Sequence, residues 1–146
     1  MMQFEYRAKL TTDPEGGYLA TFPDVPEAIT SGATKALALE SAADALAVAL
    51  LGRMEDGDDL PAASASGRGL HPVAVPAPVA AKLAVMAAFK ASGWAKIKLA
   101  EELGVNEKEV RRILDASHNT QLGRLNAAMQ ALGGRLIVSA EWKLAG

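Results

Sequence analysis

Residues 16–34 read GGYLATFPDVPEAITSGAT, and this stretch decides the fold predicted for the first half of the chain. Aromatic and small side chains alternate from residue 18 to residue 22, which is typical of a half-buried β-strand. Pro23 and Pro26 then end the strand, because proline has no backbone N–H to donate to a neighbouring strand. Another short strand signal ends at Gly32, so the stretch predicts two strands separated by a proline-bounded loop.

The flanking segments extend this pattern into a small sheet with one helix. Residues 3–10 alternate between apolar and charged side chains, which predicts a strand joined by the turn cluster TTDPEGG to the quoted stretch. Thr34 is placed to cap a helix, whose apolar residues follow at helical spacing. A polar loop that we expect to be flexible covers 56–69, and one more strand precedes residue 76. Residues 1–76 are therefore predicted to form a β-β-β-α-β domain.

Residues 77–146 are predicted to form a second, mainly α-helical domain. Its centre has the pattern of a helix-turn-helix, with an apolar face on each of two short helices and Gly104 at the turn, where glycine adopts a left-handed backbone without strain. RLIVSAEW (135–142) predicts a terminal strand. We expect this strand to pair with a second copy of the chain, and packing within its own subunit is the alternative. The chain as a whole is predicted to be α+β.

Polar and basic side chains gather on the second helix of the predicted motif and beside it. A recognition helix presents its N-terminal and outward residues to base edges, where Arg and Lys bond guanine, Asn bonds adenine and Glu accepts from cytosine. Residues around the motif suit phosphates. The candidate DNA-binding residues are Lys96, Asn106, Glu107, Lys108, Arg111, Arg112, Asn119 and Thr120. The alternative is a helical bundle with solvated charges.

Charge is distributed unevenly between the two predicted domains. The net charge is −2, but residues 1–76 hold five basic and eleven acidic side chains, whereas the rest of the chain holds ten basic and six acidic ones. An acidic half and a basic half suggest two partners of opposite charge. Chance scatter of charge between two folded units is the alternative.

The composition also bears on compartment. The chain has no cysteine, which excludes disulfides and thiolate metal sites and is typical of a reducing compartment. The first residues have no signal-peptide pattern, and the most apolar run, 73–89, is interrupted by two prolines and Lys82 and is too short to span a bilayer. We therefore expect a cytoplasmic protein without a membrane partner.

Catalytic and metal-binding patterns are not recognisable in the sequence. Two-metal cleavage needs carboxylates that converge from strands, but most acidic residues of the first domain fall in predicted turns and loops, and only Glu5 lies on a predicted strand. The acidic segment EDGDD lacks the ligand spacing of a calcium loop. Neither His71 nor His118 has a recognisable triad partner. We expect no catalytic residue, no metal site and no cofactor.

The quoted stretch and the helix after it resemble the N-terminal domain of HicB-type antitoxins. That family's motif runs roughly Gly-Gly-Tyr, aromatic-Pro-Asp-Leu-Pro, Thr-x-Gly-x-Thr and then a helix. The matching residues are Gly16, Gly17, Tyr18, Phe22, Pro23, Asp24, Val25, Pro26, Thr30, Gly32 and Thr34. The chain departs from the family at Glu27-Ala28, where a Gly-Cys pair is common. The second domain is similar to the helix-turn-helix module that many such proteins carry.

The resemblance implies a partial ribonuclease-H-like fold and an antitoxin function. Such proteins bind HicA, a small basic toxin that cleaves mRNA, and repress their own operon by binding operator DNA, usually as a homodimer or a higher homo-oligomer. The candidate toxin-binding residues are Tyr18, Phe22, Pro23, Asp24 and Val25. For Tyr18 and Phe22, core packing is favoured over direct toxin contact. The competing interpretation is a stand-alone transcription regulator whose N-terminal domain binds a ligand or another protein.

Overall fold

Within the described part of the chain, a four-stranded sheet and one long helix are followed by four shorter helices. The computed structural model describes residues 1–143. The elements are, in order, β1 (Glu5–Thr12), β2 (Tyr18–Thr21), β3 (Ile29–Gly32), α1 (Lys35–Glu55), β4 (Leu70–Ala74), α2 (Ala77–Ser92), α3 (Lys96–Leu103), α4 (Glu107–Leu114) and α5 (Leu122–Ala131). The predicted α+β class and the β-β-β-α-β order of the first half are confirmed.

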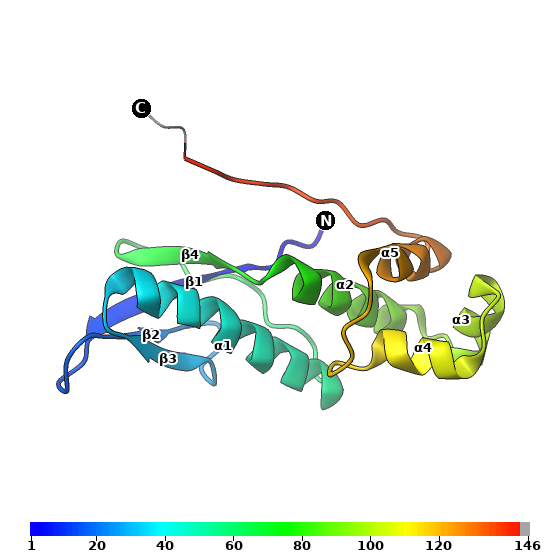
Figure 1. The fold of residues 1–146 in the computed structure, drawn as a ribbon, viewed down its shortest axis with the longest axis horizontal. Coiled ribbons are helices and arrows are strands. Elements are labelled where there is room, and N and C mark those ends of the chain that lie inside the picture. The colour runs from blue at the N-terminus through cyan, green and yellow to red at the C-terminus, as the bar shows by residue number, and fades with distance from the viewer. Residues whose placement is uncertain (144–146) are drawn as a thin grey trace.

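The sheet is antiparallel throughout, with strand order β3-β2-β1-β4. Helix α1 covers one of its faces (Figure 1). The helix starts where the sequence predicted, because the Thr34 hydroxyl accepts a hydrogen bond from the Leu37 N–H at 3.1 Å. Gly32 allows the close approach of this first turn to β3, since a Cβ on Gly32 would lie 2.3 Å from the backbone nitrogen of Ala38. Sheet and helix are therefore locked together at the start of α1.

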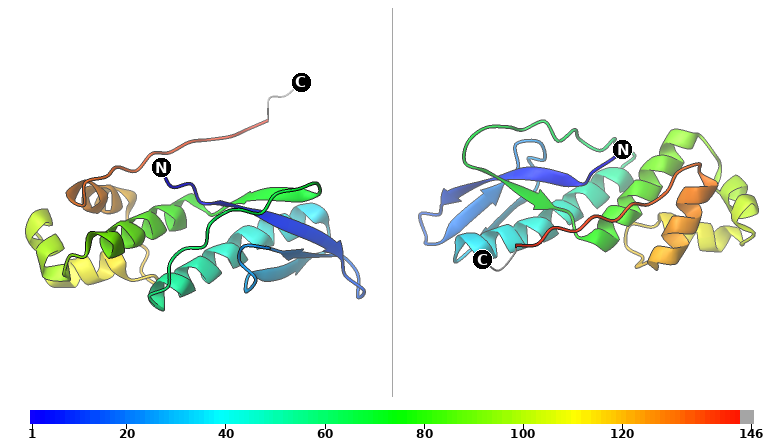
Figure 2. Two further views of the ribbon diagram at one scale, coloured as in Figure 1. Left: turned by 180° about the vertical axis from the view of Figure 1, so that it is seen from behind. Right: turned by 90° about the horizontal axis from the view of Figure 1, so that it is seen from above.

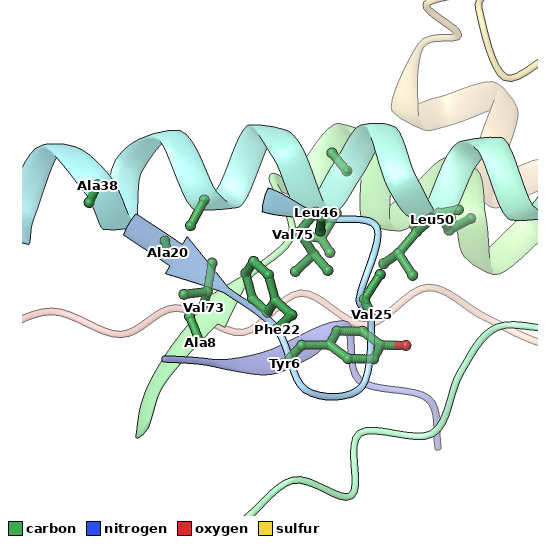
Figure 3. Close-up of a cluster of buried hydrophobic side chains, with 14 residues drawn as sticks. Tyr6, Ala8, Ala20, Phe22, Val25, Ala38, Leu46, Leu50, Val73 and Val75 are labelled. Atoms are coloured by element: carbon green, nitrogen blue, oxygen red, sulfur yellow. The ribbon is translucent and has the colours of Figure 1, made fainter. Parts of the chain in front are cut away.

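Apolar side chains from both layers meet between the sheet and α1. Ala8, Ala20 and Phe22 come from the sheet side, and Ala38, Leu46 and Leu50 from the helix, all at most 2% exposed. Figure 3 shows the Phe22 ring between the two layers. Small alanines let the helix lie close to the sheet, while Phe22 fills the wider centre.

Helix α2 contributes buried residues to two of the three hydrophobic clusters found among residues 1–143. Val79, Ala80 and Leu83 pack against the core between sheet and α1, whereas Ala81 and Val85 pack with residues of α4 and α5. Figure 1 shows α2 running from the sheet towards the group of α3, α4 and α5. The predicted boundary at residue 76 therefore lies where β4 ends, but the helix beyond it joins the two halves.

Helices α3 and α4 form the predicted helix pair. Gly104 ends α3 with a φ of 66°, a left-handed conformation that glycine adopts without strain, and α4 begins three residues later. The inner faces of the pair meet through Leu99, Ala100 and Val110, which are at most 4% exposed. Helix α5 closes this unit, with Leu125, Ala128 and Met129 turned inward.

The prediction of a terminal strand at 135–142 is wrong for the single chain. Residues 134–143 run extended, without helix or strand, away from α5 (Figure 2). A strand needs a neighbour to satisfy its backbone groups, and within residues 1–143 none lies beside this segment. Leu136 is half-buried on the second core, but Ile137, Val138 and Trp142 are 59%, 75% and 76% exposed. The segment is therefore an apolar, unpaired extension of the chain.

Candidate nucleic-acid interface and partner-binding surface

Helix α4 presents its polar face to solvent, as the sequence predicted. Val110 and Ile113 are buried, whereas Glu107, Lys108 and Arg111 are exposed. Asn106 is the N-cap of α4, because its side-chain oxygen accepts a hydrogen bond from the Glu109 N–H at 2.9 Å. Its NH2 group is the part still able to donate to a base edge.

Several of the candidate side chains on α4 take part in ion pairs at the surface. Arg111 lies 3.6 Å from Glu107, and Arg112 lies 3.0 Å from Glu109. Glu109 also binds Arg124 at the start of α5. All three arginine side chains remain about half exposed, so these pairs are weak and can be exchanged for phosphate contacts. Among residues 1–143, Lys108 makes no ion pair and is the freest cation on the helix.

Arg124 is a candidate that sequence reasoning missed. It lies on α5, outside the predicted helix pair, and reaches back across fifteen positions to Glu109 on α4. With Arg112, Asn119 and Gln121 it lines a shallow surface hollow between α4 and α5. Its position in the first turn of a helix after a polar loop is a signal visible in the sequence, but its partner on α4 is not.

The remaining DNA candidates divide into exposed and buried ones. Lys96 is exposed at the first position of α3, and Asn119 is exposed in the loop between α4 and α5. Thr120 is only 7% exposed, and its hydroxyl lies 2.6 Å from the amine of Lys82. Thr120 therefore faces the interior, which removes its hydroxyl from direct phosphate contact.

The candidate partner-binding residues of the first domain are also divided by burial. Phe22 and Val25 are at most 2% exposed, so their side chains act in the core. Pro23 is exposed and Tyr18 half-buried, with the Lys35 amine 5.6 Å from the Tyr18 ring centre. This burial agrees with core packing of Phe22, and it leaves Tyr18 and Pro23 as the side chains that a partner can reach.

Asp24 holds the segment 56–69 against the loop between β2 and β3. Its two carboxylate oxygens accept from the Ser64 hydroxyl at 2.9 Å and the Ala65 N–H at 2.8 Å. The Ala65 hydrogen bond is the main reason that the pKa of Asp24 lies below its usual 3.8. The Tyr6 hydroxyl donates to the carbonyl of Pro61 at 2.7 Å. The predicted loop thus has no helix or strand, but side chains bind it at three places, the third being the Lys90 amine, which contacts the Gly57 carbonyl and the Asp59 carboxylate.

Glu27, where the chain departs from the family motif, binds Arg53 near the end of α1. The two side chains form a pair of hydrogen bonds of 2.6 and 2.8 Å. These bonds hold the pKa of the Glu27 carboxyl at about 2, against an ordinary value of 4.5. The Glu27 carboxylate therefore connects the loop between β2 and β3 to the end of α1.

The outer face of α1 carries a stripe that sequence reasoning missed. Leu37, Glu40, Asp44 and Val48 are all exposed, Leu37 by 49% and Val48 by 72%. Their spacing of three, four and four places them on one side of the helix, opposite the buried alanine and leucine residues. The same spacing was visible in the sequence, and only the burial of the other face shows that this one is free.

Neither metal clusters nor membrane-spanning helices occur in the part of the chain that the structure describes. No group of three or more His, Asp or Glu side chains within residues 1–143 is placed to hold a metal ion. No helix in that range is long and apolar enough to cross a bilayer.

Comparisons with known proteins agree on one family. Residues 5–84 match a family model described as HicB_like antitoxin of bacterial toxin-antitoxin system. Antitoxin HicB 1 of Photorhabdus laumondii is 39% identical over 137 residues, 92% of this chain and 87% of that protein. Antitoxin HicB of Escherichia coli (strain K12) is 37% identical over 131 residues, 90% of this chain and 95% of that protein. Antitoxin HicB of Pseudomonas fluorescens is 31% identical over 141 residues, 96% of each chain. The matches to these relatives extend over both halves of the molecule.

Proposed function

Because this chain belongs to the HicB_like antitoxin family of bacterial toxin–antitoxin systems, we propose that it neutralises a small HicA-like mRNA-cleaving toxin and represses its own operon. The observation that carries the proposal is the pairing of two surfaces of opposite charge on one molecule. Residues 1–76 hold eleven acidic side chains against five basic ones, and the rest holds ten basic against six acidic. The chain itself acts by binding, without catalysis.

The toxin is proposed to dock on the outer face of α1. Leu37 and Val48 supply apolar contact at the two ends of the stripe, and Glu40 and Asp44 supply negative charge between them. This combination suits a small basic protein, since complementary charge speeds encounter and buried apolar area gives affinity. Tyr18 lies beside the first turn of the same helix, with the Lys35 amine 5.6 Å from its ring centre, and adds a half-buried aromatic side chain to the surface. Asp24 shapes the neighbouring loop through its hydrogen bonds to residues 64 and 65.

Operator DNA is proposed to bind along α4. Lys108, Arg111 and Arg112 lie on its outer face, and Asn106 and Glu107 at its start, the end that enters the major groove in a helix-turn-helix. Lys96 and Asn119 flank the helix and suit phosphates, and Arg124 adds a further cation beside Arg112. In this proposal Thr120 supports the interface from inside.

The repressor is proposed to act as a homodimer. Reading two half-sites about 34 Å apart requires two recognition helices. The extended segment 135–142 offers a second copy unpaired backbone groups together with the exposed side chains of Ile137 and Val138. Antiparallel pairing with its twin would turn this segment into the strand that the single chain lacks.

Paired variants test the division of labour. We expect Arg111→Ala with Arg112→Ala to weaken operator binding at least tenfold in a gel-shift assay, because two cations leave the interface, while growth rescue from the toxin persists. Asp44→Lys should do the reverse, since it places a positive charge before a basic partner. Glu15→Lys, an equal charge change in the β1–β2 turn, is the control. If each variant damages both functions while the protein stays folded, the two-surface proposal is wrong.

A stand-alone regulator whose first domain binds a small molecule is the second candidate. It predicts operator binding without any toxin partner encoded beside this chain. Co-expression with the adjacent reading frame, followed by purification of the complex, separates the two candidates.

A further inference from the structure

Lys82 is a buried cation at the junction between α2 and α4. Only 5% of the surface of this residue is exposed. The amine lies 2.7 Å from the carbonyl oxygen of Ile113, 3.1 Å from that of Arg112 and 2.6 Å from the hydroxyl oxygen of Thr120. All three donor positions of the ammonium group therefore have an acceptor. Burial lowers the pKa of Lys82, and these bonds offset the cost of removing a cation from water.

Two of the three acceptors of the Lys82 amine are backbone carbonyls at the C-terminal end of α4. The last carbonyls of a helix have no partner within the helix and form its negative end. Helix α4 has no left-handed cap, since Asp115 after it is extended with φ −82° and ψ 117°. Lys82 binds two carbonyls of this last turn, that of Ile113 and that of Arg112, of which the second also accepts from the Asp115 N–H at 3.2 Å. Thr120 ties the following loop to the same point, and its hydroxyl also lies 3.0 Å from Nδ1 of His118.

We call the contacts of the Lys82 amine with Arg112, Ile113 and Thr120 the Lys82 clamp. This clamp fixes two parts of the proposed DNA interface relative to each other. Arg112 belongs to the last turn of α4, and its own carbonyl is one of the acceptors. Asn119 is exposed in the loop, directly before the clamped Thr120. The residue after Lys82, Leu83, is fully buried in the core between sheet and α1. Lys82 therefore joins the proposed recognition helix to the loop that is proposed to contact phosphate. Its neighbour Leu83 anchors α2, the helix that carries Lys82, in the core of the sheet domain.

We propose that Lys82 is a positioning residue for operator recognition, which holds α4 and the loop 115–121 in the geometry that base contacts require. The inference rests on the proposed DNA-binding function. Lys82 makes no DNA contact of its own, because it faces the interior. It acts on specificity: phosphate attraction depends on the number of cations, whereas base contacts depend on their placement.

The test compares operator DNA with a scrambled duplex of equal length. We expect Lys82→Met to weaken operator binding about tenfold, the loss of one or two hydrogen bonds to a charged group, while binding to scrambled DNA and its salt dependence stay the same. Thr120→Val removes one of three acceptors and should give a smaller change in the same direction. Lys90→Met, on the exposed side of the same helix, is the matched control. Lys108→Ala should instead weaken both duplexes and reduce the salt slope.

The outcomes distinguish a failure of the positioning role of Lys82 from a failure of the proposed DNA-binding function. Equal loss on both duplexes, or no loss with either variant, overturns the positioning role, because general destabilisation acts on all binding alike. If the unmodified protein does not prefer its operator, the proposed DNA function fails. The clamp is then judged by hydrogen exchange of the amides at 113–121. Faster exchange in Lys82→Met than in Lys90→Met supports the clamp, and equal exchange overturns it.

Discussion

The carboxylate of Glu27 and the guanidinium of Arg53 face each other in a two-pronged ion pair, with the Arg53 Nε 2.6 Å from Oε2 and Nη2 2.8 Å from Oε1. The pair joins the proline-bounded loop to the end of α1 across 26 positions of sequence. It lies near the surface, since the Glu27 side chain is 44% exposed and that of Arg53 26% exposed. The pair therefore orients the loop more than it stabilises the fold.

A double-mutant cycle on this pair should give a small coupling energy. We expect Glu27→Ala, Arg53→Ala and the double variant to show a coupling of about 0.5–1 kcal/mol in urea unfolding, because water and salt screen a half-exposed pair. A coupling well above about 2 kcal/mol would contradict this view of the pair as a weak, orienting contact.

The same pair should make stability depend on pH below neutrality. The Arg53 hydrogen bonds lower the pKa of Glu27 from its ordinary 4.5 to about 2, so the contribution of the pair is fully present above pH 4.5. Solvent screening of the half-exposed carboxylate keeps this contribution within the small coupling energy expected above. The contribution is lost progressively as the pH falls from 4.5 towards 2. The free energy of unfolding of Glu27→Gln should therefore fall less steeply than that of the unmodified protein in this window. Equal slopes would exclude the depressed pKa.

Asp24 should control the order of the segment 56–69. We expect Asp24→Ala to increase proteolytic cleavage and amide exchange between residues 61 and 66, because the Ser64 hydroxyl and the Ala65 N–H lose their acceptor. Asp44→Ala, an exposed carboxylate on α1, is the control. Unchanged protection in Asp24→Ala would mean that the Tyr6 contact to Pro61 and the Lys90 contacts to Gly57 and Asp59 suffice to hold the segment.

Two glycines of the first domain should respond in opposite ways to alanine. Gly32→Ala would place a Cβ 2.3 Å from the Ala38 nitrogen, a backbone atom that cannot move aside, and we expect a loss of more than about 2 kcal/mol. Gly52 lies within α1 and has open space around its Cβ position, so Gly52→Ala should stabilise by about 0.5–1 kcal/mol. Urea unfolding measures both changes, and similar values would contradict the close approach at Gly32.

Removing residues 135–146 should convert the proposed dimer into a monomer. Light scattering gives the mass, and operator affinity should fall at least tenfold, because each protein would then bind one half-site. The surroundings of Trp142 offer an independent signal: its 76% exposed ring should become less exposed on dimerisation, with a blue-shifted emission. Comparison with Trp142→Phe separates the fluorescence of Trp142 from that of Trp94. A truncated chain that still dimerises would place the interface elsewhere.

Local chemistry made much of the fold readable from sequence. Alternation predicted β1 and β2, the Thr34 hydroxyl marked the start of α1, and Gly104 marked the turn between α3 and α4. These features depend on residues close in sequence, whose backbone preferences act before any packing. The terminal strand failed for a related reason. Its β-branched residues have the right local preference, but a strand exists only beside another strand.

The candidate sites were less readable, because they depend on which side chains are free. Phe22 and Thr120 carry the residue types expected at binding surfaces, yet both are buried. Arg124 and the outer stripe of α1 were missed, since their exposure and neighbours arise from packing of the other elements.

The amino-acid order by itself determined the succession of strands and helices from β1 to α5, the Thr34 cap, the turn at Gly104 and the opposite charge of the two halves. Only the tertiary structure decided which polar groups are already engaged: Glu27 by Arg53, Asp24 by Ser64 and Ala65, and Thr120 by Lys82. The physical reason is distance along the chain. These partners lie 26 to 41 positions apart, and packing of whole elements brings them within hydrogen-bonding distance.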